Sequence, residues 1–180
     1  PDILLPSHGD PIYGADLIEE KLTRYRNAIA YVHDETVRGM NAGADVFTLM
    51  RTITLPPELA IQESYGNLPI SIRGIFEGYL GYFDGNPSNM FAYAPRDVYG
   101  ELVDLAGTAA IVARAEALSQ AGEHERALLL LDVALEAAPD DTSAWQARRD
   151  ALVALQGAVD NYNVNGWLLR GINEANANLP

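Results

Sequence analysis

Apolar residues recur at steps of three and four over most of the chain, and this spacing predicts helices. The longest such stretch runs from Asp16 to about Asn41, and Gly43 is a suitable stop after it. Asp16 and Glu19 have the spacing of a capping box, with aspartate as the cap. The helix should span about 40 Å at roughly 1.5 Å per residue. Its apolar face is expected to hold Ile18, Leu22, Tyr25, Ile29, Val32 and Thr36.

A central stretch, ISIRGIFEGYLGYFDGNPSN over residues 70–89, begins like a helix and ends like a tight turn. Gly74, Gly78 and Gly81 have the spacing of one helical face, although each glycine costs about 1 kcal/mol relative to alanine. Such a face usually lets another backbone approach closely. We therefore expect it to contact either a second copy of the chain or the chain's own long helix. The other positions are largely apolar, which predicts a helix buried on all sides.

Shorter elements surround this stretch. Asp45 should cap a helical turn over residues 46–51, and Pro56 and Pro57 should open a second turn. After the central helix, the segment 88–94 is irregular and aromatic. We expect its Phe91 and Tyr93 to lie flat over the core.

From Pro95 onward the pattern is helical, with helices expected over 97–106, 108–122, 123–138, 142–155 and 161–178. The third and fourth of these resemble tetratricopeptide repeats over about one and a half repeats. Fewer than three repeats do not form a stable solenoid, so the pattern favours helical hairpins packed inside a larger domain, with a peptide-binding groove as the alternative. The positions that carry this likeness are Gly122, Ala127, Leu131, Ala134, Pro139 and Trp145.

The first residues have a different character. The apolar run from Ile3 to Leu5 is long enough for one short strand, and a single strand cannot form a sheet by itself. We interpret it as the last strand of a sheet in a preceding domain. Residues 1–14 are therefore expected to belong to that domain, and residues 15–180 to an all-α domain. The opening Pro1-Asp2, without an initiator methionine, also suggests a piece of a longer protein.

Composition excludes several partners. The chain carries 25 acidic and 12 basic side chains, for a formal net charge of −13. Such a surface repels nucleic acid and anionic membranes, so neither is expected as a partner. The absence of cysteine excludes disulfides and thiolate metal sites. No apolar run approaches the roughly 20 residues of a membrane span.

The sequence contains few residues in arrangements typical of a catalytic or metal-binding site. His8 follows the first strand in a loop, where functional groups are often found, but no second metal ligand lies near it in sequence. His33, Asp34 and Arg38 form either a solvated charged strip or part of a site. Neither a Ser-His-Asp nucleophile elbow nor a phosphate-binding glycine loop is present. Composition and spacing lead only to an acidic, helical domain with a short N-terminal strand.

Several motifs nevertheless resemble one family, the metallo-β-lactamase-fold alkylsulfatases. The run SHGDPIYG over residues 7–14 is similar to that family's last metal-binding loop, and YVHDETVR over 31–38, with Asn41 and Gly43, resembles the helix that follows. Leu55-Pro56, Tyr65-Gly66 and above all YLGYFDGNP over 79–87 resemble the family's helical domain. The likeness runs across nearly the whole chain and weakens after Leu155. It implies the helical dimerisation domain of a homodimer, between a hydrolase domain and a small domain of sterol-carrier type.

The resemblance also implies roles for single residues. His8 would be one ligand of a binuclear zinc centre, where the metal activates water and polarises a sulfate ester. Arg38, Asn41 and Tyr65 would be substrate-side or structural polar positions. Ile70 departs from the family, which carries a histidine there that assists the leaving group. Isoleucine cannot donate a proton, which weighs against a long-chain alkyl sulfate as the substrate and leaves a related ester as the alternative.

Two hypotheses follow for the chain as a whole. The first is a segment of a zinc-dependent, alkylsulfatase-like hydrolase, comprising its helical dimerisation domain and its last metal-ligand loop. The second is a stand-alone, tetratricopeptide-like interaction module without catalysis.

Overall fold

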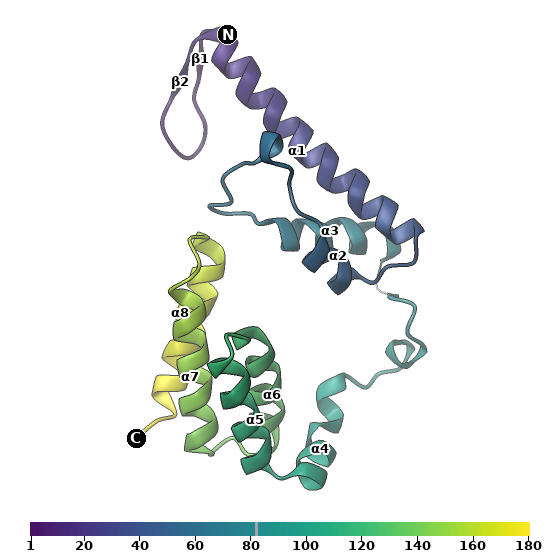
Figure 1. Ribbon diagram of the computed structural model, residues 1–180, viewed down its shortest axis with the longest axis vertical. Coiled ribbons are helices and arrows are strands. Elements are labelled where there is room, and N and C mark those ends of the chain that lie inside the picture. Colours follow the sequence, from purple (N-terminus) through teal and green to yellow (C-terminus); the bar gives the residue numbers. More distant parts are fainter. Residues whose placement is uncertain (82) are drawn as a thin grey trace. The chain divides into compact units, whose positions relative to one another are not determined.

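The computed structural model of the chain, drawn in Figure 1, describes residues 1–81 and 83–180. Tyr82, within the YLGYFDGNP motif, lies outside the described residues. The chain divides into two compact units, Pro1–Gly85 and Asn86–Pro180. The described residues are mostly helical, as predicted. Their elements are β1 (Ile3–Leu4), β2 (Ile12–Tyr13), α1 (Ala15–Asn41), α2 (Val46–Thr52), η1 (Pro57–Leu59), α3 (Leu68–Leu80), η2 (Pro87–Met90), η3 (Pro95–Val98), α4 (Tyr99–Ala106), α5 (Thr108–Gln120), α6 (His124–Ala137), α7 (Thr142–Gln156) and α8 (Tyr162–Ala177).

The N-terminal residues form a small hairpin, in which β1 and β2 are antiparallel and Ile3 lies opposite Tyr13. The prediction of one strand was therefore wrong, because the apolar pair after Pro11 supplies a second strand. That pair is a β-branched residue and an aromatic one, the types that strands favour. Ile3 is 53% exposed and Tyr13 is 64% exposed, so this hairpin is not a buried sheet.

The long helix α1 has nearly the predicted length. It ends at Asn41, and Gly43 follows with a φ of +81°, a conformation that favours glycine. Its start differs from the predicted capping box, since Gly14 is the N-cap and no side chain caps the helix. Asp16 already lies in the first turn, so its carboxylate faces the helix dipole without serving as the cap.

The core of the first unit lies where α1, α2 and α3 meet. Asp45 caps α2 by accepting a 3.0 Å hydrogen bond from the backbone N–H of Thr48. The helices α1 and α2 approach closely at Gly39, where an added Cβ would lie 2.3 Å from Leu49 Cδ2. The buried members of this core are Val32, Leu49, Ile53, Ile72 and Phe76.

Helix α3 is well capped but only partly covered. The Asn67 side chain accepts a 2.9 Å hydrogen bond from the Ile70 N–H, and Gly81 ends the helix with a φ of +68°. Ile72 and Phe76 are its buried residues, whereas Tyr79 is 61% exposed. The prediction of burial on all sides was wrong, because only one face of α3 meets the core of its unit.

The second unit starts with two 3₁₀ turns. The helix expected from Asp97 begins only at Tyr99, because Asp97 belongs to η3 and its carboxylate accepts a 2.5 Å hydrogen bond from the Ala94 N–H. Phe91 and Tyr93, which were expected to cover the core, are 75% and 81% exposed. They lie between η2 and η3, in a segment too short to pack its own aromatic side chains.

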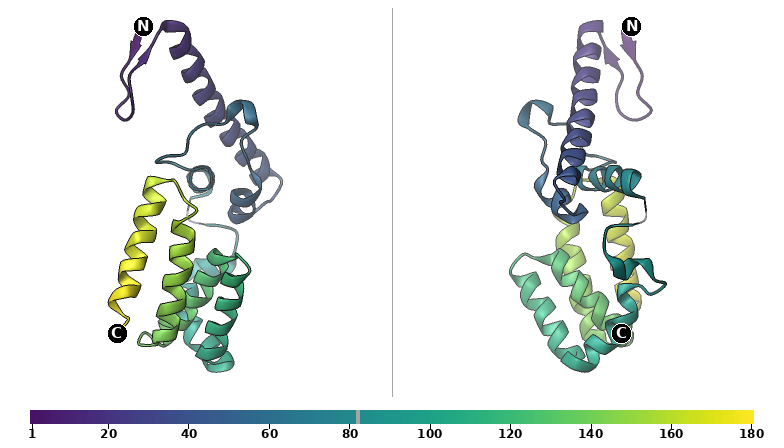
Figure 2. Two further views of the ribbon diagram at one scale, coloured as in Figure 1. Left: turned by 60° about the vertical axis from the view of Figure 1, so that its left-hand side comes forward. Right: turned by 90° about the vertical axis from the view of Figure 1, so that its right-hand side faces the viewer.

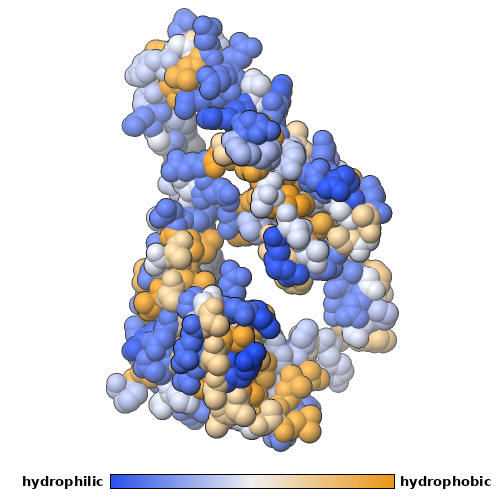
Figure 3. All heavy atoms as spheres, in the orientation of Figure 1, coloured by the Kyte–Doolittle hydropathy of each residue, from blue (hydrophilic) through white to orange (hydrophobic). Residues whose placement is uncertain are grey.

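The remaining helices of this unit pack in sequence order, α5 on α6, α6 on α7 and α7 on α8, while α4 also contacts α6. Figure 2 shows these helices side by side. Half of the core residues of this unit are alanine, which lets neighbouring helices approach closely. Figure 3 shows that apolar side chains also reach the surface of both units. Among the described helices, none combines the length and apolar character that a membrane span requires. The core of the unit consists of Ile111, Val112, Ala115, Leu118, Ala127, Leu131, Ala134, Leu135, Ala144 and Ala147.

Candidate functional site

His8 lies in the loop of the hairpin, and the fold brings it against Tyr65. The two rings are tilted, with centroids 5.0 Å apart. Tyr65 belongs to the segment that leads into α3, so the contact joins two loops that are distant in the chain. The Nδ1 atom of His8 is 3.2 Å from the Ser7 hydroxyl. This arrangement leaves the Nε2 atom of an exposed imidazole available to an external group.

Arg38 and Asn41 lie at the other end of α1, away from the hairpin (Figure 1). Arg38 pairs with Glu35 one turn earlier, and this hydrogen bond lowers the pKa of the Glu35 carboxyl and raises that of the Arg38 guanidinium. Asn41 is the exposed last residue of α1. The structure therefore does not place these two residues next to His8.

A second polar cluster contains His33 and Asp34, which the sequence analysis named, and Tyr79, which it did not link to them. His33 on α1 lies between Asp34 and Tyr79, with Nδ1 2.9 Å from Asp34 Oδ1 and Nε2 2.7 Å from the Tyr79 hydroxyl. The link joins α1 to the C-terminal half of α3. His33 belongs to the YVHDETVR motif and Tyr79 to the YLGYFDGNP motif, so the contact joins two of the motifs that carry the resemblance. That both motifs point to the same family is the one feature of the sequence that could have suggested the contact.

An apolar cleft lies between α1, α3 and the segment 55–68, and we refer to it as the α1–α3 cleft. Its volume is about 400 Å³. Polar residues of its lining include Glu63, Asn67 and Ser71. Its principal apolar lining residues are Tyr25, Ile29, Val32, Leu55, Leu68 and Ile75.

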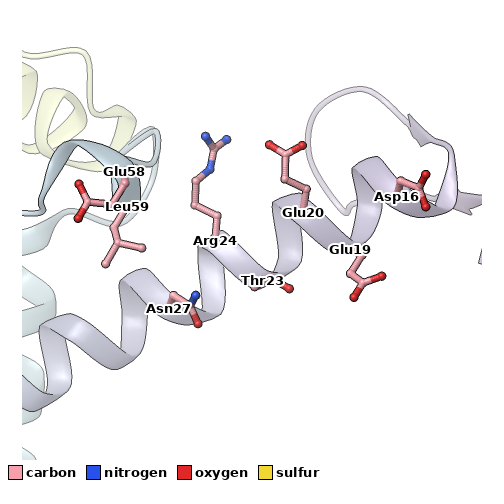
Figure 4. Close-up of a pocket in the computed structure, with 8 residues that line it drawn as sticks. All are labelled: Asp16, Glu19, Glu20, Thr23, Arg24, Asn27, Glu58 and Leu59. Carbon is pink, nitrogen blue, oxygen red and sulfur yellow. The ribbon is translucent and has the colours of Figure 1, made fainter.

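A second hollow, about 600 Å³ in volume, lies where η1 faces the first half of α1. Figure 4 shows Glu20 and Arg24 extended from the same side of α1, with Glu58 on the facing turn. Four carboxylates and one guanidinium give this hollow an acidic character.

Three carboxylate or imidazole groups do not converge on a possible metal position anywhere in the described residues. The donor groups of the described residues therefore do not by themselves make up a complete zinc site. His8, with Nδ1 oriented by Ser7, fits a single coordination position, as a neutral imidazole donor.

The glycines of α3 have open surroundings. A Cβ added at Gly74 or Gly78 would meet no atom of the described residues within 4 Å. Both lie on the face of α3 away from Ile72, together with Ile70, which is 58% exposed. Gly81 is the C-cap rather than a member of the helix. The long helix of the same chain therefore does not occupy this face.

Comparisons with known proteins relate the chain to alkylsulfatases, both in sequence and in fold. Residues 47–178 match the family model described as alkyl sulfatase dimerisation. A linear primary-alkylsulfatase from a Pseudomonas strain is 34% identical over 99% of the chain, and an alkyl/aryl-sulfatase of Saccharomyces cerevisiae is 30% identical over 86%. The chain spans 35% and 25% of the lengths of these two relatives. The solved structure of the stereoselective inverting sec-alkylsulfatase Pisa1 from Pseudomonas superimposes with a TM-score of 0.90 at 25% identity, covering 99% of the chain and 29% of that protein.

Proposed function

Because the chain belongs to the alkyl sulfatase dimerisation family, we propose that it joins two identical copies of a zinc-dependent sulfate-ester hydrolase. The observation that carries the proposal is the open face of α3. A Cβ added at Gly74 or Gly78 would meet nothing of another described element within 4 Å, and Ile70 on the same face is 58% exposed. Glycines on a helix face permit a close helix–helix approach, which accounts for their cost in helix stability.

A two-fold dimer would use this face on both copies. The chain has a mass of 19.5 kDa, so light scattering should give twice that value. If light scattering gives the mass of a single chain at high protein concentration, the proposal that this part of the protein dimerises is wrong.

The same proposal assigns His8 as one ligand of a binuclear zinc centre, completed by residues outside this chain. The zinc ions would activate water and polarise the sulfate ester. What supports the assignment is the exposed imidazole, fixed by Ser7 on one side and by the Tyr65 ring on the other. In this proposal Tyr65 stands on the substrate side, whereas Arg38 and Asn41 stabilise the end of α1.

The identity of residue 70 limits which sulfate esters are expected as the substrate. Ile70 lies in the first turn of α3 and has no proton to give, so the leaving group must receive its proton from another residue or from water. We therefore propose a sulfate ester whose leaving group needs less assistance than a long-chain alkoxide.

The metal role is tested in the longer protein, by comparing His8→Ala with His124→Ala. His124 lies on α6 in the other unit, where it bonds the Ser119 hydroxyl at 2.8 Å. We expect His8→Ala to reduce sulfate release at least about a hundredfold, because even the loss of a residue that only orients a metal ligand costs about 10–100-fold, while His124→Ala retains activity. Equal activity of both variants would contradict the assignment.

The packing of α5 to α8 supports a likeness to tetratricopeptide repeats, which forms part of this proposal. Ala127 and Ala134 are fully buried, and the Trp145 indole N–H donates a 2.7 Å hydrogen bond to the Pro139 carbonyl. A stand-alone interaction module is not favoured, because the family match extends through these helices.

A further inference from the structure

We infer that Asp84-Gly85 is a site of spontaneous covalent modification, at which the aspartate converts to isoaspartate. Two of the chain's aspartate and asparagine residues are followed by glycine, Asp84 and Asn165. Glycine favours the reaction because it has no Cβ to hinder attack by its backbone nitrogen on the preceding side chain. In an unfolded chain asparagine reacts faster, since an ionised carboxylate is a poor electrophile at neutral pH. The sequence alone therefore favours Asn165, whereas the structure favours Asp84.

The reaction is a condensation followed by a hydrolysis, and it needs no oxidant, reductant or cofactor. The Gly85 backbone nitrogen bonds to Cγ of Asp84 and gives up its proton, and the hydroxyl of the carboxylic acid leaves with that proton as water. The product is a succinimide ring. Water then opens the ring at either carbonyl, which restores aspartate or leaves isoaspartate, whose backbone runs through the former side chain.

The surroundings of Gly85 permit this attack. Asp84 and Gly85 are both exposed, in the segment between the end of α3 and the start of η2. The Gly85 N–H donates no hydrogen bond to another described residue, so no such bond has to break before its nitrogen attacks. A Cβ built at Gly85 would meet no atom of the described residues within 4 Å, which leaves room for the ring.

The second candidate, Asn165-Gly166, is protected by α8. Both residues lie inside this helix, so the Gly166 N–H takes part in the hydrogen bonding of the helix. The Asn165 Oδ1 accepts a 3.0 Å hydrogen bond from Nε2 of Gln156, the last residue of α7. The helix has to open locally before this asparagine can react, and local opening costs free energy.

The modification alters the junction between the two units. Gly85 is the last residue of the first unit and Asn86 the first residue of the second. Isoaspartate at position 84 adds a methylene to the backbone beside this boundary and attaches the free carboxylate directly to Cα. The buried residues of both cores lie elsewhere in the chain, so we expect each unit to keep its fold after the modification.

Incubation of the native chain at neutral pH, beside a sample unfolded in urea, tests the inference. Methyl transfer by an isoaspartate methyltransferase with labelled S-adenosylmethionine, followed by peptide mapping, locates the isoaspartate. In the native chain the main labelled position should be 84. Unfolding should raise the ratio of label at position 165 to label at position 84 at least about tenfold, the equivalent of about 1.4 kcal/mol of protection by α8.

Two variants complete the test. Asp84→Glu keeps the charge but would have to close a six-membered ring, so the label at this position should be lost. Asn165→Gln is the matched control and should leave the labelling of the native chain unchanged. If Asp84→Glu fails to fold by circular dichroism, the comparison of the native and unfolded wild-type chain decides alone.

Three results would overturn the inference. They are label mainly at position 165 in the native chain, label at position 84 only after unfolding, and equal label at position 84 in Asp84→Glu and the wild type. Each would mean that the native segment does not favour the reaction at Asp84. The dimer and hydrolase proposals depend on α3 and His8, so their assays judge them separately.

Discussion

Replacing Gly78 with leucine separates the stability of the folded chain from its assembly. A Cβ at this position meets nothing within 4 Å in the described residues, so Gly78→Leu should not disturb the unit's own core. Leucine is a better helix former than glycine by about 0.8 kcal/mol, and the free energy of unfolding of the monomer should rise by roughly that amount.

The dimer should respond in the opposite direction. If the glycine face meets its equivalent on a second copy, a leucine side chain overpacks the contact at a cost of about 1–3 kcal/mol, and two-fold symmetry applies that cost twice. A loss of at least about 2 kcal/mol corresponds to a dissociation constant roughly 30-fold higher. Sedimentation equilibrium measures this constant, while urea unfolding measures stability.

Gly39→Ala is the matched control, since this glycine also lies within a helix. An alanine Cβ there would lie 2.3 Å from Leu49 Cδ2, and Leu49 is only 5% exposed. We expect a net destabilisation of about 1–2 kcal/mol despite the gain in helix propensity. A Gly78→Leu variant that unfolds, or that dimerises as tightly as the wild type, would refute the reasoning.

Two further predictions concern the metal and pH. The 180-residue chain should bind no zinc one-to-one more tightly than roughly 1 μM in calorimetry, because His8 is a single ligand; a tighter site that His8→Ala removes would contradict this. The Ser143 hydroxyl and the N–H groups of Ala144 and Ser143 lower the pKa of the Asp141 carboxyl, so the stability it provides is present above its unfolded pKa of roughly 3.9 and is lost as pH falls through the lower folded value. Asp141→Ala should cost about 1 kcal/mol at pH 7 in urea unfolding, and the difference should shrink at more acidic pH; a difference that stays constant down to pH 2 would count against the cap.

The sequence predicted the helices well where spacing and stop signals agreed. The long helix α1 ends at the predicted Asn41, before Gly43, because the three-and-four spacing and a glycine stop coincide there. The strand β2 was not predicted, because a stretch of two residues is too short to show the alternation of apolar and polar residues that is typical of a strand. For the glycine face of α3 the sequence left two partners open, since a face that permits close packing looks the same in sequence whether its partner is the same chain or another one.

The candidate site was predicted only as separate residues. His8 and Tyr65 were both named from the resemblance, but their contact depends on how the hairpin and the segment before α3 fold together. The His33–Tyr79 hydrogen bond likewise joins positions 46 residues apart. Local periodicity carries no information about such pairs, and one sequence taken by itself offers no covariation to reveal them.

The separate cores of the two units matter during synthesis on the ribosome. The buried core of the first unit ends at Phe76, so all of its members have been added before the helices α4 to α8 are translated. Domains generally fold as units during elongation, with the N-terminal one first. The surface around the open face of α3 is thus formed while the second unit is still being made, and two neighbouring nascent chains on one messenger RNA could pair before either is complete.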